Sequence, residues 1–338
     1  MKWNEERLNE LLTTPSDSLK EFVQTLDSDL AILGAGGKVG STIAVLARRA
    51  LDEVGSDLEV YAVSRYSDPE KRKEIEAFGV KTIAADLTVD EDLAKLPDFQ
   101  NIIFLAGRKF GTSGAEAITW EFNASLPTLV TRRFKGARFV VFSTGNIYPL
   151  VSPKTGGATE QTPVSPIGEY AMSSLARERI FEYAALEYGT KVTMFRLNFA
   201  IDLRYGVLAD IAKQVINDEP VNLTVPNFNC VWQGYMAEVA IRSLGEASTD
   251  VFVLNVTGPE TASTRKSAEK LAELLGKDVT FGPEGELSLL NDASKCMKLY
   301  GYPQVSLDQM IEWQVEWMQS GGRDIGAPTH FEVNEGDF

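Results

Sequence analysis

The chain has 338 residues, of which 44% are hydrophobic and 24% charged, a balance typical of a globular protein and unlike that of a disordered or fibrous one. Its 33 basic and 48 acidic residues give a formal net charge of −15, which opposes binding to phosphate backbones, so nucleic-acid binding is not expected. One histidine (His330, near the end of the chain) and two cysteines are too few for a zinc site or a histidine-based nucleophile system, so no metal is expected.

Residues 1–28 are predicted to form a helical extension. Apolar residues from Leu8 to Leu12 and from Leu19 to Leu26 recur at spacings of three and four, which predicts two short amphipathic helices broken near Pro15. Charges throughout this segment argue against a signal peptide, and no run approaches the roughly 18 apolar residues that span a bilayer, so no membrane association is expected. Two widely separated cysteines do not indicate a disulfide framework, and a cytoplasmic location is therefore predicted.

Between residues 29 and 200, short apolar runs alternate with helical patterns. Helices are expected at about 38–53, 69–78, 90–96, 115–134 and 168–188. Six runs are typical of buried parallel strands: Leu30–Leu33, Glu59–Val63, Lys81–Ala84, Asn101–Leu105, Arg138–Phe142 and Lys191–Leu197. This alternation predicts an α/β fold with a doubly wound parallel Rossmann sheet that binds a dinucleotide.

After residue 200 the alternation ends, and residues 201–322 are predicted to form a smaller, mostly helical substrate domain. Its helices are expected at about 207–218, 264–275, 291–299 and 306–319, with a Pro/Asn-containing stretch at Val221–Asn229. The isolated apolar run Val251–Val256 is expected to add a strand to the main sheet. Residues 323–338 are a short polar tail, either docked or loose.

A glycine-rich turn links the first strand to the first helix. The residues expected to surround a dinucleotide diphosphate are Gly34, Gly36, Gly37, Lys38, Val39 and Gly40. Glycines permit a tight turn and close approach of the backbone to phosphate, and the following helix N-terminus offers free N–H groups. A purely structural glycine turn is the alternative.

The end of the second strand bears on the choice of dinucleotide. An acidic residue at this place would bind the ribose 2′-hydroxyl of NAD, but the chain has Ser64 and Arg65 there, with Lys38 expected nearby. A hydroxyl and a guanidinium suit a 2′-phosphate, so NADP is predicted, with NAD possible.

The ordered motifs from residue 29 to about 256 resemble the extended short-chain dehydrogenase/reductase family, the NAD(P)-dependent epimerases and dehydratases that act largely on nucleotide sugars. Gly34-x-x-Gly37-x-x-Gly40 is similar to the family's glycine motif, Ser143-Thr144 to its catalytic hydroxyl pair, and Tyr170 to its catalytic tyrosine. The resemblance implies catalytic roles for Thr144, Tyr170, Ser143 and Lys109. It implies cofactor contacts for Asp86, Leu87, Leu105, Ala106, Gly107, Lys109, Ser174 and Asn198.

The chain departs from the family pattern at two places. The family's lysine four residues after the tyrosine is Ser174 here, and a serine can replace the lysine's hydrogen bond to the nicotinamide ribose but not its charge. Lys109 is the expected substitute for that charge, and Arg177 is expected to pair with a carboxylate. In addition, Gly145-Asn146 stands where sugar 4,6-dehydratases carry Asp-Glu, so dehydration is disfavoured.

These observations predict hydride transfer at a secondary alcohol or ketone of a sugar-like substrate, by an NAD(P)-dependent reductase or epimerase. Arg204, Trp232 and Gln233 are candidate substrate contacts. A homodimer is expected through the helices at 115–134 and 168–188, which offer Phe134, Ile180, Phe181 and Tyr183. The alternative is an NADP(H)-binding sensor in which Ser174 has ended catalysis.

Overall fold

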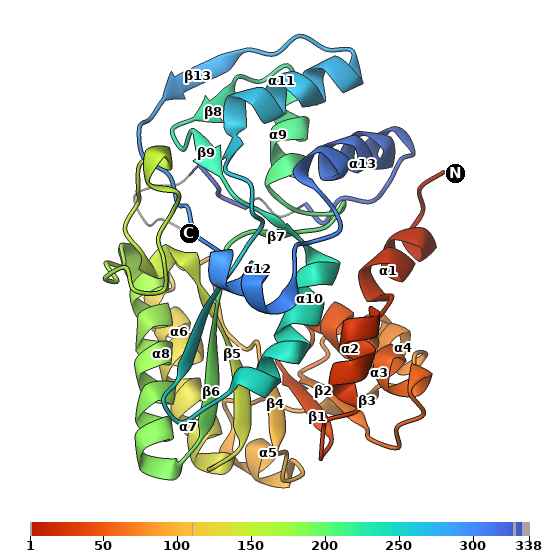
Figure 1. Cartoon of the computed structure of the whole chain (residues 1–338), viewed down its shortest axis with the longest axis vertical. Helices are drawn as coiled ribbons and strands as arrows, with labels where there is room; N and C mark the ends of the chain where they lie inside the picture. The colour runs from red at the N-terminus through yellow and green to blue at the C-terminus, as the bar shows by residue number, and fades with distance from the viewer. Residues whose placement is uncertain (1, 110, 327–328, 333–338) are drawn as a thin grey trace.

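The computed structural model describes residues 2–109, 111–326 and 329–332 (Figure 1). Its largest element is a seven-stranded parallel sheet in the order β11-β6-β5-β4-β1-β2-β3, which confirms the predicted doubly wound α/β fold. The strands are β1 (Leu30–Leu33), β2 (Val60–Ser64), β3 (Lys81–Ala84), β4 (Asn101–Phe104), β5 (Arg138–Thr144), β6 (Lys191–Leu197) and β11 (Phe252–Val256).

Helices cover both faces of this sheet because its central strands are buried on both sides. Along β1, Ile32 packs with the core on one face, whereas Ala31 and Leu33 pack with the core on the other, as the two-residue period of a strand requires. The helices that flank the sheet include α2 (Asp17–Val23), α3 (Gly40–Glu53), α4 (Pro69–Glu76), α5 (Asp90–Lys95), α6 (Glu116–Trp120), α7 (Leu126–Arg133), α8 (Gly168–Tyr188) and α10 (Gln233–Arg242). Figure 1 shows α6, α7 and α8 on one side and α2, α3 and α10 on the other.

Helix α10 was not predicted from the sequence, although it belongs to the sheet's core. Met236, Val239 and Ala240 are fully buried there, together with residues of α3 and β1. The expected single helix at 115–134 also differs, because a π-helical turn, η1 (Glu121–Ser125), separates α6 from α7. Such a turn inserts an extra residue and redirects the side chains around it, here Asn123.

The smaller part of the chain lies beyond the carboxyl ends of the parallel strands (Figure 1). Its helices and short strands are β7 (Ala200–Ile201), α9 (Val207–Ile216), β8 (Val221–Leu223), β9 (Asn227–Phe228), β10 (Val231–Trp232), β12 (Ala262–Ser263), α11 (Thr264–Leu275), β13 (Phe281–Glu284) and α13 (Leu307–Gln319). Helix α12 (Ser294–Tyr300) packs on the sheet instead, with Cys296 and Met297 in the sheet's core. A separate apolar core holds the smaller part together, formed by the inward faces of α9, α11 and α13. Ligands of open α/β sheets bind at this edge, so the interface of the two parts is where a site is expected.

The N-terminal extension forms two helices, as predicted, and each packs against a different core. Leu8 and Leu12 of α1 (Glu5–Thr13) join the core of the smaller part, whereas Leu19 and Val23 of α2 join the core of the sheet. Trp3 precedes α1 and stacks edge-on against Trp313 of α13, with 5.3 Å between ring centroids. The extension therefore links the two parts of the molecule. Within the described residues, no helix is both long and apolar enough to cross a membrane.

The described part of the polar tail docks on the smaller part. Thr329 donates two hydrogen bonds of 2.7 Å to Asp210 of α9, one from its backbone N–H and one from its hydroxyl. Asp324 forms an ion pair of 2.5 Å with Lys213, and the ring of Phe331 is buried in the core of the smaller part. These contacts bring Glu332 into the electrostatic neighbourhood of Lys109, on the other side of the interface.

Candidate active site

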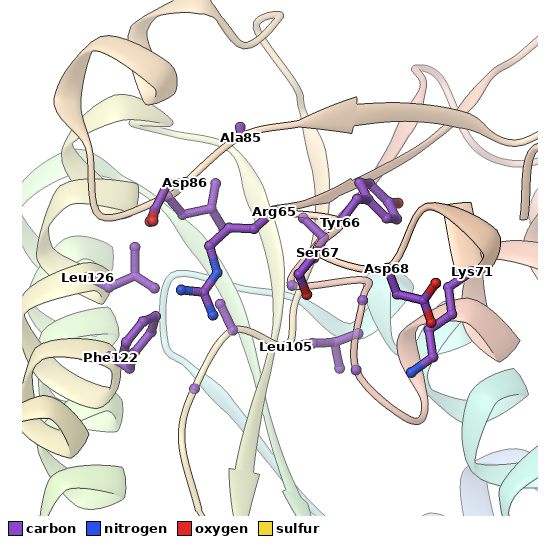
Figure 2. A pocket seen from close by; sticks show the side chains of 17 residues that line it. Arg65, Tyr66, Ser67, Asp68, Lys71, Ala85, Asp86, Leu105, Phe122 and Leu126 are labelled. Carbon is purple, nitrogen blue, oxygen red and sulfur yellow. The ribbon is translucent and has the colours of Figure 1, made fainter. Parts of the chain in front are cut away.

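A pocket of about 330 Å³ opens at the carboxyl ends of β1 to β4 (Figure 2). It brings together ten of the residues predicted to contact the cofactor: Gly34, Gly36, Gly37, Ser64, Arg65, Asp86, Leu87, Leu105, Ala106 and Gly107. These residues come from four separate loops, and they meet because parallel strands end at the same edge of the sheet.

The glycine turn packs closely against the loop after β4, where no side chain would fit at position 34. Gly34 has a φ of +91°, and a Cβ atom there would lie 2.6 Å from the backbone nitrogen of Ala106. Helix α3 follows at Gly40, after Val39, and has no side-chain cap at its N-terminus. Its first N–H groups are therefore available to a diphosphate, so the turn fits the dinucleotide that the sequence predicts.

Arg65 extends into the pocket from the end of β2 (Figure 2), and its guanidinium carbon lies 5.5 Å from the ring centroid of Phe122. Asp86 lines the same pocket, and hydrogen bonds from the hydroxyl and backbone N–H of Thr88 lower its pKa, with a further contribution from Arg65. Asp86 is thus a carboxylate available to the adenosine end of a dinucleotide. Lys71 of α4, which the sequence did not single out, also lines the pocket.

Lys38 does not join Arg65 in this pocket, contrary to the expectation from sequence. Its ammonium lies 3.1 Å from the ring centroid of Tyr205, in the smaller part, and it is not among the residues that line the pocket. Burial lowers the pKa of Lys38 to about 8, and the nearby carboxylates of Asp210 and Asp202 partly offset that effect. The ring of Tyr205 and the carboxylates of Asp202 and Asp210 therefore stabilise the Lys38 ammonium on the side of the smaller part, away from the pocket.

Three of the four predicted catalytic residues lie at the carboxyl end of β4 and β5 or at the start of α8. Thr144 is the last residue of β5, and its hydroxyl donates to Asn146 Oδ1 (2.9 Å) and accepts from the Asn146 N–H (3.2 Å). Tyr170 lies in the first turn of α8, and the Lys109 ammonium is 5.7 Å from its ring centroid. Burial and the charge of Lys38 lower the pKa of Lys109 to about 8.

Ser143, the fourth, points elsewhere. Its hydroxyl donates to Glu178 Oε1 (2.5 Å), and Glu178 forms a buried ion pair of 2.7 Å with Arg196. Neighbouring residues of a strand face opposite sides of the sheet, so Ser143 and Thr144 cannot both face one ligand. The structure therefore places Ser143 in a buried structural network rather than in the candidate active site.

Ser174 fits a role toward the cofactor. Its side chain is 1% exposed, and its hydroxyl has no hydrogen-bond partner among the described residues. A buried, unsatisfied hydroxyl one turn after Tyr170 suits a ribose hydroxyl, because it would gain the hydrogen bond that it otherwise lacks.

Asn123 of the π-helical turn is a functional residue that the sequence analysis missed. Its amide accepts from the N–H of Arg108 and donates to the carbonyl of Arg108, both at 2.9 Å, and so holds the loop that carries Lys109. It also donates to the Ser173 hydroxyl (2.9 Å), which in turn donates to the carbonyl of Tyr170 (3.1 Å). No local sequence pattern indicates the role of Asn123, because its hydrogen-bond partners lie 15 and 50 residues away in the chain.

Asn291, from the segment before α12, occupies the space beside Gly145. A Cβ atom on Gly145 would lie 2.8 Å from Asn291 Oδ1. Asn291 is 1% exposed, and neither polar atom of its amide has a hydrogen-bond partner among the residues described here. The smaller part thus fills the position next to Thr144 where a side chain of residue 145 would lie.

The candidate substrate contacts are engaged in other interactions. Arg204 pairs with Asp202 (2.6 Å) and Glu5 (3.0 Å), Trp232 packs edge-on against Trp313, and Gln233 donates to the Thr42 hydroxyl (2.9 Å). Asn198, a predicted cofactor contact, donates to Asn229 and to the carbonyl of Leu289. Asn198 thus links the end of β6 to the smaller part, whereas Arg204 and Trp232 are held within the smaller part and α1, and Gln233 joins α10 to α3. Tyr205 of the smaller part faces Lys38 across the interface. No group of three or more potential metal ligands occurs in the described ranges.

Comparison with known proteins identifies a family and structures of the same fold. The sequence model of the NAD dependent epimerase/dehydratase family matches residues 30–200, and no curated protein sequence matches the chain. A UDP-glucose 4-epimerase from Thermotoga maritima superimposes with a TM-score of 0.70 and 19% identity, covering 87% of this chain and 99% of the other. A UDP-glucuronic acid 4-epimerase from Bacillus cereus in complex with NAD gives 0.71 and 20%, covering 86% and 96%. A dTDP-glucose 4,6-dehydratase from Streptomyces venezuelae with NAD bound gives 0.71 and 19%, covering 86% and 97%. At these identities the similarity establishes the fold.

Proposed function

Because the chain belongs to the NAD-dependent epimerase/dehydratase family, we propose that it transfers hydride at a secondary alcohol or ketone of a sugar-like substrate, as a reductase or epimerase. The observation that supports this most is the Lys109 ammonium beside the ring of Tyr170, on the same loop that supplies Gly107 to the pocket lined by the predicted cofactor residues. A nicotinamide cofactor, when bound, supplies or accepts the hydride.

In this mechanism the chain's residues bind, orient and move one proton. The glycine turn and the start of α3 bind the diphosphate, and Ser174 holds a ribose hydroxyl. Thr144 hydrogen-bonds the reacting oxygen, and the Tyr170 hydroxyl gives a proton to that oxygen or takes one from it. Gly145 and Asn146 carry no acid or base, which supports simple hydride transfer rather than dehydration.

A titration with NAD and NADP, followed by a screen of nucleotide sugars and sugar acids for a change in nicotinamide absorbance, tests this proposal. Turnover of any such substrate supports the enzyme. Tight cofactor binding without turnover of any of them would favour the second candidate, a sensor, for which the observation is Ser174 in place of a lysine.

We propose that NADP is the preferred cofactor, because Arg65 and Lys71 both line the pocket and Ser64 ends β2. Arg65→Ala should weaken NADP binding by about tenfold or more, the magnitude of a lost charged hydrogen bond, and should change NAD binding much less. Dissociation constants for both cofactors measure this, and Lys71→Ala should act in the same direction. Equal losses for NAD and NADP would show that Arg65 does not contact a 2′-phosphate.

Lys109 should make cofactor binding depend on pH. Its pKa of about 8 means that it is protonated below pH 8 and loses its positive charge as the pH rises through that value. The dissociation constant of the cofactor should therefore increase from about pH 7 to about pH 9. Arg stays protonated in this range, so Lys109→Arg should abolish the dependence. Lys38→Arg is the control for the second lysine with a pKa near 8, and a dependence lost only in that variant would assign the effect to Lys38.

We also propose a cytoplasmic homodimer that associates through α8. Two of the four residues expected at this contact, Phe134 and Phe181, are instead buried in the protein's own core. Tyr183 is 58% exposed and Leu186 84% exposed on the outer face of α8, so these two residues are available to a second copy. Light scattering should give a dimer mass at micromolar concentration and a monomer mass for Leu186→Glu, whereas a monomeric unmodified protein would contradict the proposal.

A further inference from the structure

Arg177 is a buried cation close to the candidate active site. Its side chain is 6% exposed, and it makes no ion pair with any carboxylate of the described residues. Its guanidinium instead donates to the carbonyl of Phe142 (2.7 Å) and to Asn123 Oδ1 (2.5 Å). Glu178, the next residue in the chain, pairs with Arg196 instead. The prediction that Arg177 pairs with a carboxylate is therefore wrong.

Tyr170, Ser174 and Arg177 lie on one stripe of α8, because spacings of four and three residues return to the same helix face. Two turns of helix, about 10.5 Å of rise, separate Tyr170 from Arg177. Side chains of a helix lean toward its N-terminus, so the Arg177 side chain leans from its own turn in the direction of Ser174. The hydrogen bonds from Arg177 to Asn123, from Asn123 to Ser173 and from Ser173 to the carbonyl of Tyr170 fix this arrangement.

Gly107 provides the space for this guanidinium. A Cβ atom on Gly107 would overlap the terminal nitrogen Nη2 of Arg177, so no other residue fits at position 107 while Arg177 keeps its place. The loop that lines the cofactor pocket and the buried arginine of α8 are thus complementary in shape.

We infer that Arg177 is the positioning residue whose fixed positive charge stabilises the anionic form of Tyr170 during proton exchange. This inference rests on the proposed function. Burial disfavours the charged guanidinium and holds its pKa below the ordinary value, whereas Tyr170 and Glu178 act in the opposite direction when they are negative. The stabilisation is mutual, so the same cation stabilises the tyrosinate. Arg177 stays protonated throughout, and the proton moves only between Tyr170 and the substrate oxygen.

Lys109 is the competing source of charge, and the two cations differ in how they respond to pH. Lys109, from the loop after β4, has a pKa of about 8 and so loses its charge when the solution becomes alkaline, whereas an arginine does not. Among the described residues, the ionisable groups around Tyr170 also include Glu169 before it on α8, which accepts from Trp120, and Tyr205 of the smaller part. Lys38 lies against Tyr205, and Glu332 of the tail acts on Lys109. Lys38 and Lys109 both have a pKa of about 8, so of these three cations Arg177 is the one that keeps its charge where the two lysines lose theirs.

The test compares Arg177→Gln, which keeps an amide donor but removes the charge, with Arg177→Lys, which keeps a charge. Arg179→Gln is the matched control, because Arg179 lies on the exposed face of the same helix and pairs with Glu182. With a substrate found by the screen above, Arg177→Gln should lose about two powers of ten in kcat at neutral pH, and its rate should rise with pH where the unmodified enzyme is level. Arg177→Lys should recover part of the rate, and Arg179→Gln should behave as the unmodified enzyme. Equal losses with parallel pH profiles in both Arg177 variants would show a purely structural role.

A second measurement does not depend on turnover. Tyrosinate absorbance is titrated for the protein and for Tyr170→Phe, and the difference reports the ionisation of Tyr170; the same pair is measured in the Arg177→Gln background. The Tyr170 difference signal should appear at higher pH without Arg177, and an unchanged signal would overturn the inference. A shifted signal in a protein that turns over no substrate would contradict the proposed function and leave the role of Arg177 standing.

Discussion

Tyr170→Phe should reduce turnover by about two to four powers of ten, the range found when a general acid or base is removed. Phenylalanine keeps the ring, its place in the first turn of α8 and the Lys109 ammonium near the ring face, and deletes only the hydroxyl. The dissociation constants of NAD and NADP should therefore stay within a few-fold of their original values. The measurement is kcat with a confirmed substrate, together with cofactor titrations.

Two controls make this prediction specific. Tyr183→Phe removes a hydroxyl from the exposed outer face of the same helix and should leave kcat unchanged. Thr144→Val, which keeps the shape of the side chain at the end of β5, should slow turnover as well, because the reacting oxygen loses a hydrogen bond. Undiminished turnover by Tyr170→Phe would remove the proposed proton exchange altogether.

Gly145→Asp should destabilise the protein by about 3–5 kcal/mol, because it places a charged side chain in a buried, already filled space. The first atom of that side chain would lie 2.8 Å from Asn291 Oδ1, so the Asn291 side chain would have to move out of a space in which it is buried. Thermal or denaturant unfolding measures the loss. The experiment also asks whether the Asp found in 4,6-dehydratases can be accommodated in this chain.

The double variant Gly145→Asp/Asn291→Ala tests the cause. Asn291→Ala removes the amide that fills the space, so the second substitution should recover much of the stability lost by the first, and the two effects should be strongly non-additive. Asn291→Ala alone should cost little hydrogen-bond energy, since the described residues offer its amide no partner. Additive losses would mean that Gly145 is needed for another reason.

The sheet and the glycine turn could be predicted because both depend on local patterns. Buried parallel strands have continuous apolar runs, and the turn joins one such run to a helix, so each of the six expected strands lies within two residues of its observed limits. The strands β8 and β9 are too short to show a period, whereas α10 has apolar residues at helical spacing (Met236, Val239 and Ala240) that the sequence analysis missed.

The site was harder to predict wherever partners are distant in sequence. The position of Asn123 depends on a π-helical turn and on a loop 15 residues earlier, and Asn291 meets Gly145 only when the smaller part folds over the sheet. Ser143 is different: the two-residue period of β5 already indicates that it faces away from the ligand side occupied by Thr144, but the resemblance to a family motif favoured it. Sequence spacing likewise suggested that Arg177 pairs with a carboxylate. In the structure its acceptors are the carbonyl oxygen of Phe142 and the amide oxygen of Asn123.

The N-terminal extension has a consequence for how the protein unfolds. Helix α1 contributes Leu8 and Leu12 to one apolar core and α2 contributes Leu19 and Val23 to the other, with Ser16 between them capping α2 and hydrogen-bonding Glu238 of α10. Each core is complete only when its own helix is in place, and the two helices are neighbours in the chain, so unfolding of one part pulls on the segment that completes the core of the other. The two parts are therefore coupled into one cooperative unit, and their most protected amide hydrogens should exchange with solvent through the same global opening rather than through separate ones.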